Sequence, residues 1–312
     1  MEIPFYDATD SVPNSPLITH LCEIFFLHLG CNYPFIQRAR FMRDLDEKRL
    51  NAILVDAICA LAARFSTHPL LTTPNTSDGN DPDISNSLHK SEYGQAFAQR
   101  AMSAVVGSFP CPKMAVVQAC VLLAYEQFGS NRDSGLWMYL GIAIRMAQDL
   151  GMQKLEGIRF EGRVGPTPKS AKSGQAGKFG EKMSETERLT ENLSGDGNPG
   201  SIDEQRANER ERINTFWAVF FLDRVISSGT GRPVTLRDED IELPFPSLEE
   251  VDPISGWPVP FPALIRIIHL YGRVTDLLNS IREVNHVTPE TLQRLAGIEN
   301  DLTGTCSVEA SA

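Results

Sequence analysis

The sequence contains no run of eighteen apolar residues, no C-x-x-C pair and no basic cluster large enough to offset its acidity. The first absence excludes an ordinary transmembrane helix, and the N-terminal residues lack the basic and apolar regions of a secretory signal. The six cysteines are scattered, which excludes the paired spacing of structural zinc sites and favours reduced thiols. We therefore expect no membrane partner and no metal site in this chain.

Charge of one sign dominates the composition. Lys and Arg together number 29, whereas Asp and Glu number 40, which gives a formal net charge of −11 at pH 7. Proteins that bind nucleic acid through its phosphates normally carry a basic face. An acidic chain repels polyanions on average, so the composition predicts no DNA-contacting residues and no direct contact with nucleic acid.

Catalytic signatures are also missing. The sequence has no H-E-x-x-H metal motif, no G-x-S-x-G nucleophile motif and no G-x-x-x-x-G-K-[ST] phosphate loop. Residues 195–200 match G-x-G-x-x-G, but no strand is predicted before them, and Pro199 lacks the amide donor that a dinucleotide would need. The sequence therefore predicts that the chain is not an enzyme and has neither catalytic residues nor a cofactor.

Apolar residues make up 42% of the chain and recur at the spacing of helix faces. No run alternates with the period of a strand, so the predicted fold class is all-α, either a multi-helix bundle or an irregular α–α array. At Ser15-Pro16, a capping side chain precedes a proline suited to the first helical turn. The predicted helices cover about residues 15–29, 50–65, 88–106, 113–128, 134–150, 203–225 and 264–278, with a short one after Pro289.

The composition changes at residues 157–200, where Gly, Ser, Lys and Glu dominate and large apolar residues are sparse. This composition predicts a disordered insertion. It need not separate two domains, because a long loop between packed helices costs little free energy. The predicted division of the chain has five parts. An N-terminal tail (1–14) precedes the first part of a helical domain (15–156), and the insertion (157–202) separates it from the second part of that domain (203–285). A C-terminal tail follows (286–312).

Four charged residues occur in or beside apolar helical segments: Arg145, Asp223, Arg224 and Arg232. A charge in apolar surroundings must be paired or hydrogen-bonded. One interpretation is therefore a buried ion-pair network that joins helices. The other is an anion-binding pocket for a small effector, because arginine offers a fixed fork of donors.

Several aromatic residues cluster in the same two regions of the sequence. They could line an effector cavity, although packing in the hydrophobic core is the ordinary role of such side chains. These candidates for pocket or core are Trp137, Tyr139, Phe216, Trp217, Phe220 and Phe221.

Two ordered sets of residues resemble the signatures of a known family. Residues 137–151 read Trp-Met-Tyr-Leu-Gly-Ile-Ala-Ile-Arg-Met-Ala-Gln-Asp-Leu-Gly. The second set, in order, comprises Glu209–Arg212, Phe216-Trp217, Leu222–Arg224, Gly231–Pro233 and Leu243-Pro244. Together they resemble the fungal-specific transcription factor domain, which is the middle homology region of fungal zinc-cluster transcription factors. The resemblance covers about residues 15–250.

The resemblance implies an all-α regulatory domain in the nucleus that modulates transcription by a DNA-bound factor. Such a domain holds activity down until an effector or partner relieves it, which requires two packings with different affinity for that ligand. The implied partners are the transcription machinery or a dimer partner, with a small-molecule effector as a further candidate. The alternative interpretation is a helical protein-interaction or dimerisation scaffold without effector binding.

Two features depart from the family pattern. The zinc-cluster module, with six closely spaced cysteines and interleaved Lys and Arg, is missing, and the first predicted helix already begins near Ser15. We therefore expect this chain to lack the module, and we expect zinc only in relatives that carry it. In addition, residues 157–200 lengthen the join between the two signatures.

Overall fold

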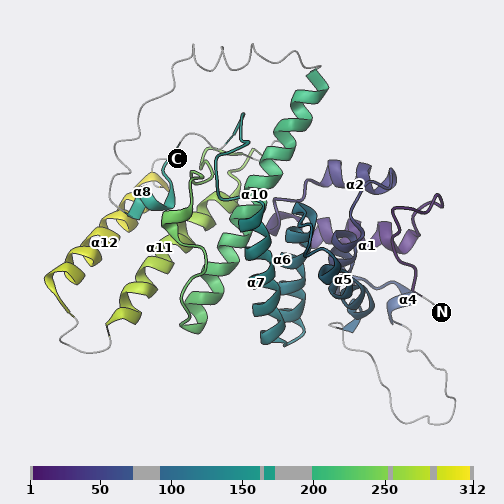
Figure 1. Cartoon of the computed structure of the whole chain (residues 1–312), viewed down its shortest axis with the longest axis horizontal. Helices are drawn as coiled ribbons and strands as arrows, with labels where there is room; N and C mark the ends of the chain where they lie inside the picture. The colour runs from purple at the N-terminus through teal and green to yellow at the C-terminus, as the bar shows by residue number, and fades with distance from the viewer. Residues whose placement is uncertain are drawn as a thin grey trace, which may run out of the picture. The chain divides into compact units, whose positions relative to one another are not determined.

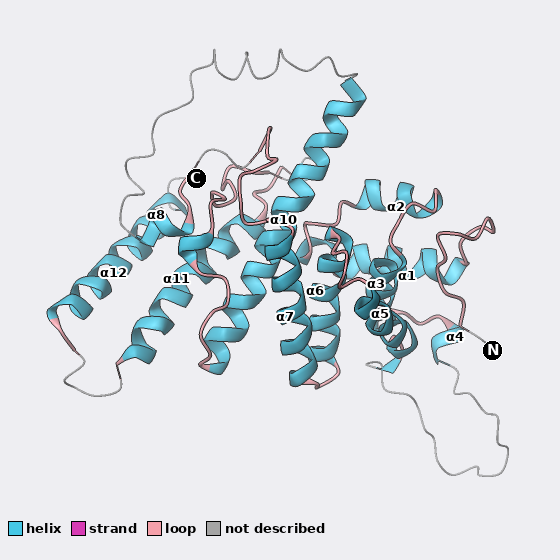
Figure 2. Cartoon of the chain, viewed as in Figure 1, coloured by secondary structure: helices cyan, strands magenta, loops and turns pink. Residues whose placement is uncertain are grey.

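The computed structural model describes residues 3–72, 92–161, 165–172, 199–251, 256–281 and 287–309. These residues form helices joined by loops, with one isolated β-bridge between Val251 and Pro258 and no strand in the described ranges (Figures 1 and 2). The all-α prediction is thereby confirmed. The chain divides into two compact units, Met1–Gly151 and Met152–Ala312, which are considered separately below.

Most helices of the first unit begin and end close to the predicted boundaries. In α1, the Ser15 hydroxyl accepts a hydrogen bond from the amide of Leu17, and Pro16 occupies the first turn, as the sequence indicates. The helices of this unit are α1 Pro16–His28, α2 Arg38–Asp46, α3 Ala52–Ala62, α4 Pro69–Thr72, α5 Gln95–Gly107, α6 Met114–Gly129 and α7 Asp133–Asp149.

The α2 helix was not predicted. Three arginines and two aspartates leave it with only two buried residues, Phe41 and Leu45. These two lie four positions apart, on one face, which is enough to dock a short helix against its neighbours. A stripe of two apolar residues is too short to show helical periodicity in a sequence, which is why the pattern was missed.

The core of the first unit surrounds α6. Residues 116–124 of this helix are all buried, as expected of a segment that is apolar almost all round. The helix packs against α3, α5 and α7, and α7 follows it as an antiparallel neighbour. The α5 helix begins at Gly94, where an added Cβ would lie 2.1 Å from the carbonyl oxygen of Ala60 in α3. Glycine therefore permits the close approach of these two helices.

An ion pair that the sequence analysis did not identify also joins α3 and α5. The Arg100 guanidinium donates from Nη2 to Oδ1 of Asp56 at 2.8 Å and to the carbonyl oxygen of Tyr6 at 2.7 Å. Asp56 is 2% exposed. Burial raises the pKa of this carboxyl to about 6, although the hydrogen bond and charge of Arg100 act in the opposite direction.

The second unit is built on three long helices, α10 Pro199–Thr230, α11 Pro260–Ser280 and α12 Pro289–Glu309. The α10 helix packs against α11, and α11 packs against α12, so the three lie side by side (Figure 1). The segment after Pro289, where a short helix and a tail were expected, is a helix of 21 residues. No helix among the described residues has both the length and the apolar character needed to cross a bilayer.

The predicted disordered insertion, residues 157–202, is described only in part, and residues 173–198 lie outside the described ranges. Within the described part, Ile158 is buried, and a short helix, α8 Pro168–Lys172, packs against the 3-10 turn η5, Asp238–Asp240. The Thr167 amide donates to the Ser170 hydroxyl at 2.9 Å, which stabilises the start of α8. Tertiary contacts therefore order pieces of this segment despite its composition.

Candidate functional site

Asp223 lies in the buried half of α10 and binds the backbone of the segment that follows the helix. Its carboxylate accepts hydrogen bonds from the amides of Thr235 at 3.0 Å and Leu236 at 2.9 Å. The chain reverses between them at Gly231, whose φ of +66° is unfavourable for other residues. Burial raises the pKa of Asp223, opposed by these hydrogen bonds and by the charge of Arg224. Asp223 thus holds the turn after α10 in place.

Arg224, the next residue, joins a buried chain of polar groups. Its Nη2 donates to Oδ1 of Asp238 in η5 at 2.6 Å, and its guanidinium stacks over the Phe220 ring at 4.5 Å. The second oxygen of Asp238 lies 3.3 Å from Nε2 of His269 in α11. The three side chains are each less than a tenth exposed. They connect α10, η5 and α11 through the interior of the unit.

The Asp238 carboxyl is held in its charged form. Burial would raise its pKa, but the hydrogen bond and charge of His269 and the charges of Arg224 and Lys172 outweigh burial and lower it to about 2. A buried carboxylate at neutral pH is stable only when charged or donating partners surround it, as they do here.

The other two predicted charged residues lie elsewhere. Arg145 belongs to α7 of the first unit, is exposed, and donates to Oε1 of Gln148 one turn away at 3.2 Å. Arg232 is exposed in the turn after α10, where its amide donates to the carbonyl of Ser227. The structure thus brings Asp223 and Arg224 together with two residues that were not predicted, Asp238 and His269. The link from Arg145 to this group stays a prediction.

The predicted aromatic residues also fall into two groups. Phe216, Trp217 and Phe220 are buried in the second unit, where the Trp217 ring meets both phenylalanines edge-on and stacks on Phe245. Their surroundings are those of a hydrophobic core. Phe221 in the same helix is half-buried, and so are Trp137 and Tyr139 in α7 of the first unit.

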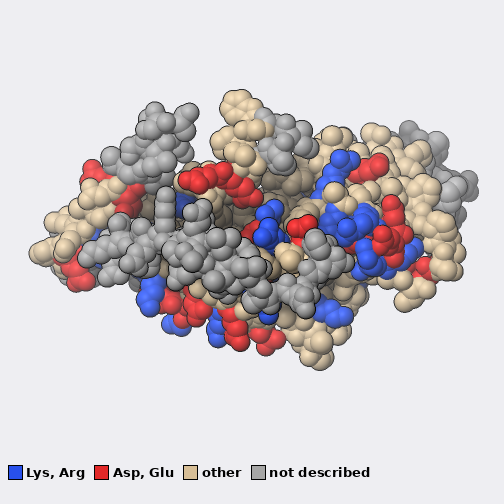
Figure 3. Space-filling view, turned by 90° about the horizontal axis from the view of Figure 1, so that it is seen from above, with Lys and Arg blue, Asp and Glu red and all other residues tan. Residues whose placement is uncertain are grey.

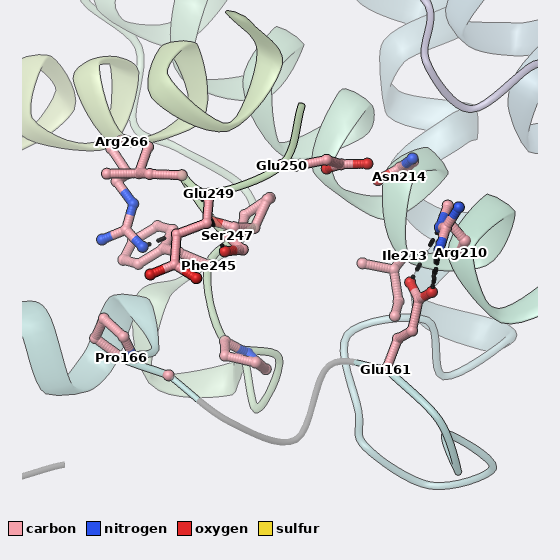
Figure 4. Close-up of a pocket in the computed structure, with 14 residues that line it drawn as sticks. Glu161, Pro166, Arg210, Ile213, Asn214, Phe245, Ser247, Glu249, Glu250 and Arg266 are labelled. Atoms are coloured by element: carbon pink, nitrogen blue, oxygen red, sulfur yellow. Dashed lines mark hydrogen bonds and ion pairs between the residues drawn. The ribbon is translucent and has the colours of Figure 1, made fainter. Parts of the chain in front are cut away.

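A pocket of about 730 Å³ opens on the second unit, beside α10 and α11 (Figure 4). This volume is within the ordinary range of small-molecule sites. None of the predicted site residues lines it. Its lining residues come from the loop before α8, from α10, from the segment after η5 and from α11. They include the charged residues and the aromatic residue Glu161, Arg210, Phe245, Glu249, Glu250 and Arg266.

At one end of the pocket, Arg266 projects from α11 beside Phe245. Its guanidinium lies 5.3 Å from the Phe245 ring centroid, and its Nη2 donates a long hydrogen bond of 3.4 Å to the carbonyl oxygen of Pro246. Its Nε is buried with no hydrogen-bond partner among the described residues. Burial lowers the pKa of Arg266, which shows that this charge is partly desolvated.

At the other end, Arg210 of α10 forms an ion pair with Glu161 at 2.7 Å, drawn as dashed lines in Figure 4. The hydrogen bond from this arginine to Glu161 raises the pKa of Arg210. The charge of Glu250 acts in the same direction. Asn214, one turn further along α10, lines the same end of the pocket.

Sequence reasoning missed this pocket, although one signal was present. Arg266 lies between Ile265 and Ile267 in an apolar helix, the same pattern that drew attention to Arg145. Many of the remaining lining residues are polar, and others belong to the Pro-rich connector at 244–246, which shows no periodicity. Nothing local in the sequence indicates that residues near 161, 210 and 266 meet.

The described residues contain no group of three or more His, Cys, Asp or Glu side chains that could hold a metal ion. Three arginines in and just after α2, Arg40, Arg43 and Arg49, all approach Asp44. On the face shown in Figure 3, Lys and Arg side chains are interspersed with Asp and Glu. The described residues thus present a helical module with a pocket in its second unit and no cluster of metal-binding side chains.

Comparison with known proteins assigns this module. Residues 22–305 match the fungal specific transcription factor domain, and the chain belongs to this family. The family is one of transcription factors rather than of enzymes, and the resemblance noted in the sequence is confirmed. No solved structure matches the chain.

Individual relatives agree with the family assignment. The chain is 26% identical over 242 residues to the Zn(2)-C6 fungal-type transcription factor FTF2 of Fusarium oxysporum f. sp. lycopersici, which covers 77% of this chain and 18% of that protein. It is 26% identical over 303 residues to FTF1c of the same fungus, covering 88% of this chain and 27% of that protein. The nitrogen assimilation transcription factor nit-4 of Neurospora crassa is 27% identical over 164 residues, 48% of this chain and 14% of that protein. The chain therefore spans less than a third of the length of each of these relatives.

Proposed function

We propose that this chain acts as the regulatory domain of a zinc-cluster-type transcription factor and modulates transcription in the nucleus. The match of residues 22–305 to the fungal specific transcription factor domain carries this proposal. DNA binding would be the task of a zinc cluster, which this sequence does not contain. The acidic composition supports a role in which the chain controls a DNA-bound factor without touching DNA itself.

A regulatory domain must exist in two arrangements that a ligand or partner can distinguish. The second unit contains helices and a connecting segment whose packing a ligand or partner could change. Asp223 and the pair Arg224–Asp238 tie α10 to the segment after it, and His269 ties that segment to α11. The pocket is lined by α10, α11 and the same connecting segment. A ligand there would contact α10 and α11, the two long helices that the polar network joins, and could therefore bias their packing.

A reporter assay tests the function. The full chain would be fused between a heterologous DNA-binding domain and a constitutive activation domain in a fungal host. We expect the chain to change reporter expression several-fold relative to the same fusion without it. A variant with Asp223→Ala, which should destabilise the second unit, should show a weaker effect at equal protein level. Equal reporter expression with and without the chain contradicts the proposal.

Nuclear localisation belongs to the same proposal. The relatives are transcription factors, which act in the nucleus. The test uses a fluorescent fusion of full-length FTF2 in which the segment that matches this chain is replaced by this chain. This fusion should accumulate in the nucleus of a fungal cell. Exclusion of this fusion from the nucleus would count against a role in transcription.

The alternative, a dimerisation scaffold without an effector, has one observation in its favour. Along α11, large apolar side chains are exposed at successive intervals of three, four and seven residues: Leu264, Ile267, Tyr271 and Leu278. This spacing is typical of a seam between two helices, so the partner would be a second copy of the chain. Sedimentation of the wild type and of Tyr271→Asp distinguishes the two: a dimer that the substitution dissociates supports the scaffold, and a monomer removes it.

A further inference from the structure

We propose that the pocket of the second unit binds a small amphoteric molecule, whose carboxylate pairs with Arg266, whose flat apolar body lies against the apolar wall between the two ends, and whose cationic amine faces Glu250. The inference rests on the proposed regulatory function, because it assigns an effector class to that domain. It follows from the charges at the two ends of the pocket and from the apolar surface between them.

Arg266 is an arginine that lacks an acidic partner. Among the described residues, no Asp or Glu oxygen lies within 4.0 Å of its guanidinium, and its contacts are the Pro246 carbonyl and the Phe245 ring. A partly desolvated guanidinium with a buried, unpaired Nε retains donors for a bound group. A planar carboxylate matches the donor fork of arginine better than any other common organic anion.

The opposite end carries an excess of negative charge. Glu161 is paired with Arg210, and Glu250 is a second carboxylate in the lining, so two carboxylates accompany one guanidinium there. A purely anionic ligand would be repelled there, and a purely cationic one would leave Arg266 unpaired. A molecule with a carboxylate at one end and an amine at the other matches both ends.

The wall between these ends is apolar. It includes the Phe245 ring, Pro244, Pro246 and the Ile213 side chain of α10. Phe245 is also fixed from behind, because Trp217 stacks on it with a centroid distance of 5.3 Å. Trp217 and Arg266 cover the Phe245 ring, which is 6% exposed, so a ligand would meet the rest of this apolar wall between the two charged ends. A flat apolar body fits such a wall.

Binding of a probe with this chemistry tests the inference. The probe is 4-(aminomethyl)benzoate, titrated into the full chain by calorimetry up to its solubility limit. Two truncated probes accompany it: 4-methylbenzoate, which lacks the amine, and 4-methylbenzylamine, which lacks the carboxylate. The variants are Arg266→Gln and Glu250→Gln. The matched controls lie outside the pocket lining: Arg206→Gln, at an arginine stacked over Phe160, and Glu290→Gln, at an exposed carboxylate in the first turn of α12.

We expect the wild type to bind the full probe more tightly than either truncated probe. Arg266→Gln should weaken the full probe and 4-methylbenzoate by roughly tenfold or more, because it removes a charge-assisted hydrogen-bond pair. Glu250→Gln should weaken the full probe and 4-methylbenzylamine but leave 4-methylbenzoate unchanged. Arg206→Gln and Glu290→Gln should not weaken any probe, and all variants should keep the wild-type circular dichroism.

Three results would overturn the inference: no heat of binding for any of the probes, equal affinity for all three, or unchanged binding in Arg266→Gln. If 4-methylbenzoate binds as tightly as the full probe and 4-methylbenzylamine does not bind, the pocket is a simple anion site and the amphoteric ligand is ruled out. A chain that alters reporter expression yet binds no probe loses the pocket assignment and keeps its regulatory function. A chain that binds the probe but has no effect on the reporter loses the regulatory function alone.

Discussion

At the scale of single residues, Asp223 and Asp238 are both buried aspartates, but their surroundings act on them in opposite ways. Burial dominates at Asp223 and raises its pKa, while its main partners are backbone amides. Charged and donating side chains dominate at Asp238 and lower its pKa to about 2. Asp223 therefore mainly fixes the backbone after α10, whereas Asp238 mainly balances the charges of Arg224 and its neighbours.

Replacement of Asp223 by alanine should destabilise the second unit. It would leave the amides of Thr235 and Leu236 without their acceptor and remove a negative charge near Arg224. The expected loss is about 3 kcal/mol, the scale for removal of one partner from a buried ionic group. Urea unfolding followed by circular dichroism measures it. Asp240→Ala, at an exposed ion pair with Arg237, serves as control and should change stability little. Equal stability of the two variants would contradict the role of Asp223.

Asp238 should make stability depend on pH in acid. Its folded-state pKa of about 2 lies below the ordinary value of 3.8, so its contribution is fully present above 3.8 and is lost as pH falls toward 2. The contribution is about 2 kcal/mol at neutral pH. The stability difference between wild type and Asp238→Asn should therefore shrink as the pH is lowered from 5 to 3 in urea unfolding. A difference that stays constant over this range would show that the carboxylate charge is not what stabilises the fold.

At the scale of secondary-structure elements, helix packing depends on a few positions where backbones approach closely. Gly94 is such a position, because α5 begins against the carbonyl of Ala60 in α3. The nearby Arg100–Asp56 pair joins the same two helices. The small Gly94 and the Arg100–Asp56 ion pair thus both hold α5 against α3. Neither contact depends on the apolar stripe by which the two helices were predicted.

Gly94→Ala should therefore destabilise the first unit by about 1–3 kcal/mol, since its Cβ would overlap backbone that cannot move without shifting α3. Gly107→Ala, at the other end of α5, is the matched control, because an added Cβ there meets no atom within 4 Å. Thermal unfolding of the two variants gives the comparison. If Gly94→Ala melts at the wild-type temperature, the close approach of α5 to α3 is not as tight as described.

At the scale of the whole molecule, charge and donor chemistry set what the chain can bind. The net charge is −11, and Arg40, Arg43 and Arg49, in and just after α2, all approach Asp44. The described residues hold no cluster of metal-binding side chains. The fold should therefore be independent of zinc, in contrast to a zinc-cluster module, whose folding depends on its metal.

Chelation provides the corresponding test. Addition of excess EDTA should leave the melting temperature and circular dichroism of the chain unchanged, and added zinc should not induce binding to DNA in an electrophoretic mobility assay. The zinc-cluster module of a relative, treated in parallel, should unfold under the same conditions. A fall in melting temperature on chelation would reveal a structural metal in this chain.

Much of the fold could be predicted because helix formation is signalled locally. The apolar spacing in 50–65, 113–128 and 264–278 corresponds to α3, α6 and α11, and the cap at Ser15 marks the start of α1. The α2 helix and the full length of α12 were missed, because their polar sequences show little periodicity and their stability comes from neighbours.

The amino-acid sequence alone determined the helical class, the family and the burial of Asp223 and Arg224, because each is encoded in nearby residues. Only the tertiary structure decided which groups meet: Asp238 and His269 with Arg224, and Arg266 and Phe245 with Arg210 and Glu161. The reason is physical. Periodicity and caps act within a few turns of chain, whereas a pocket is formed by side chains whose proximity results from packing of the whole unit.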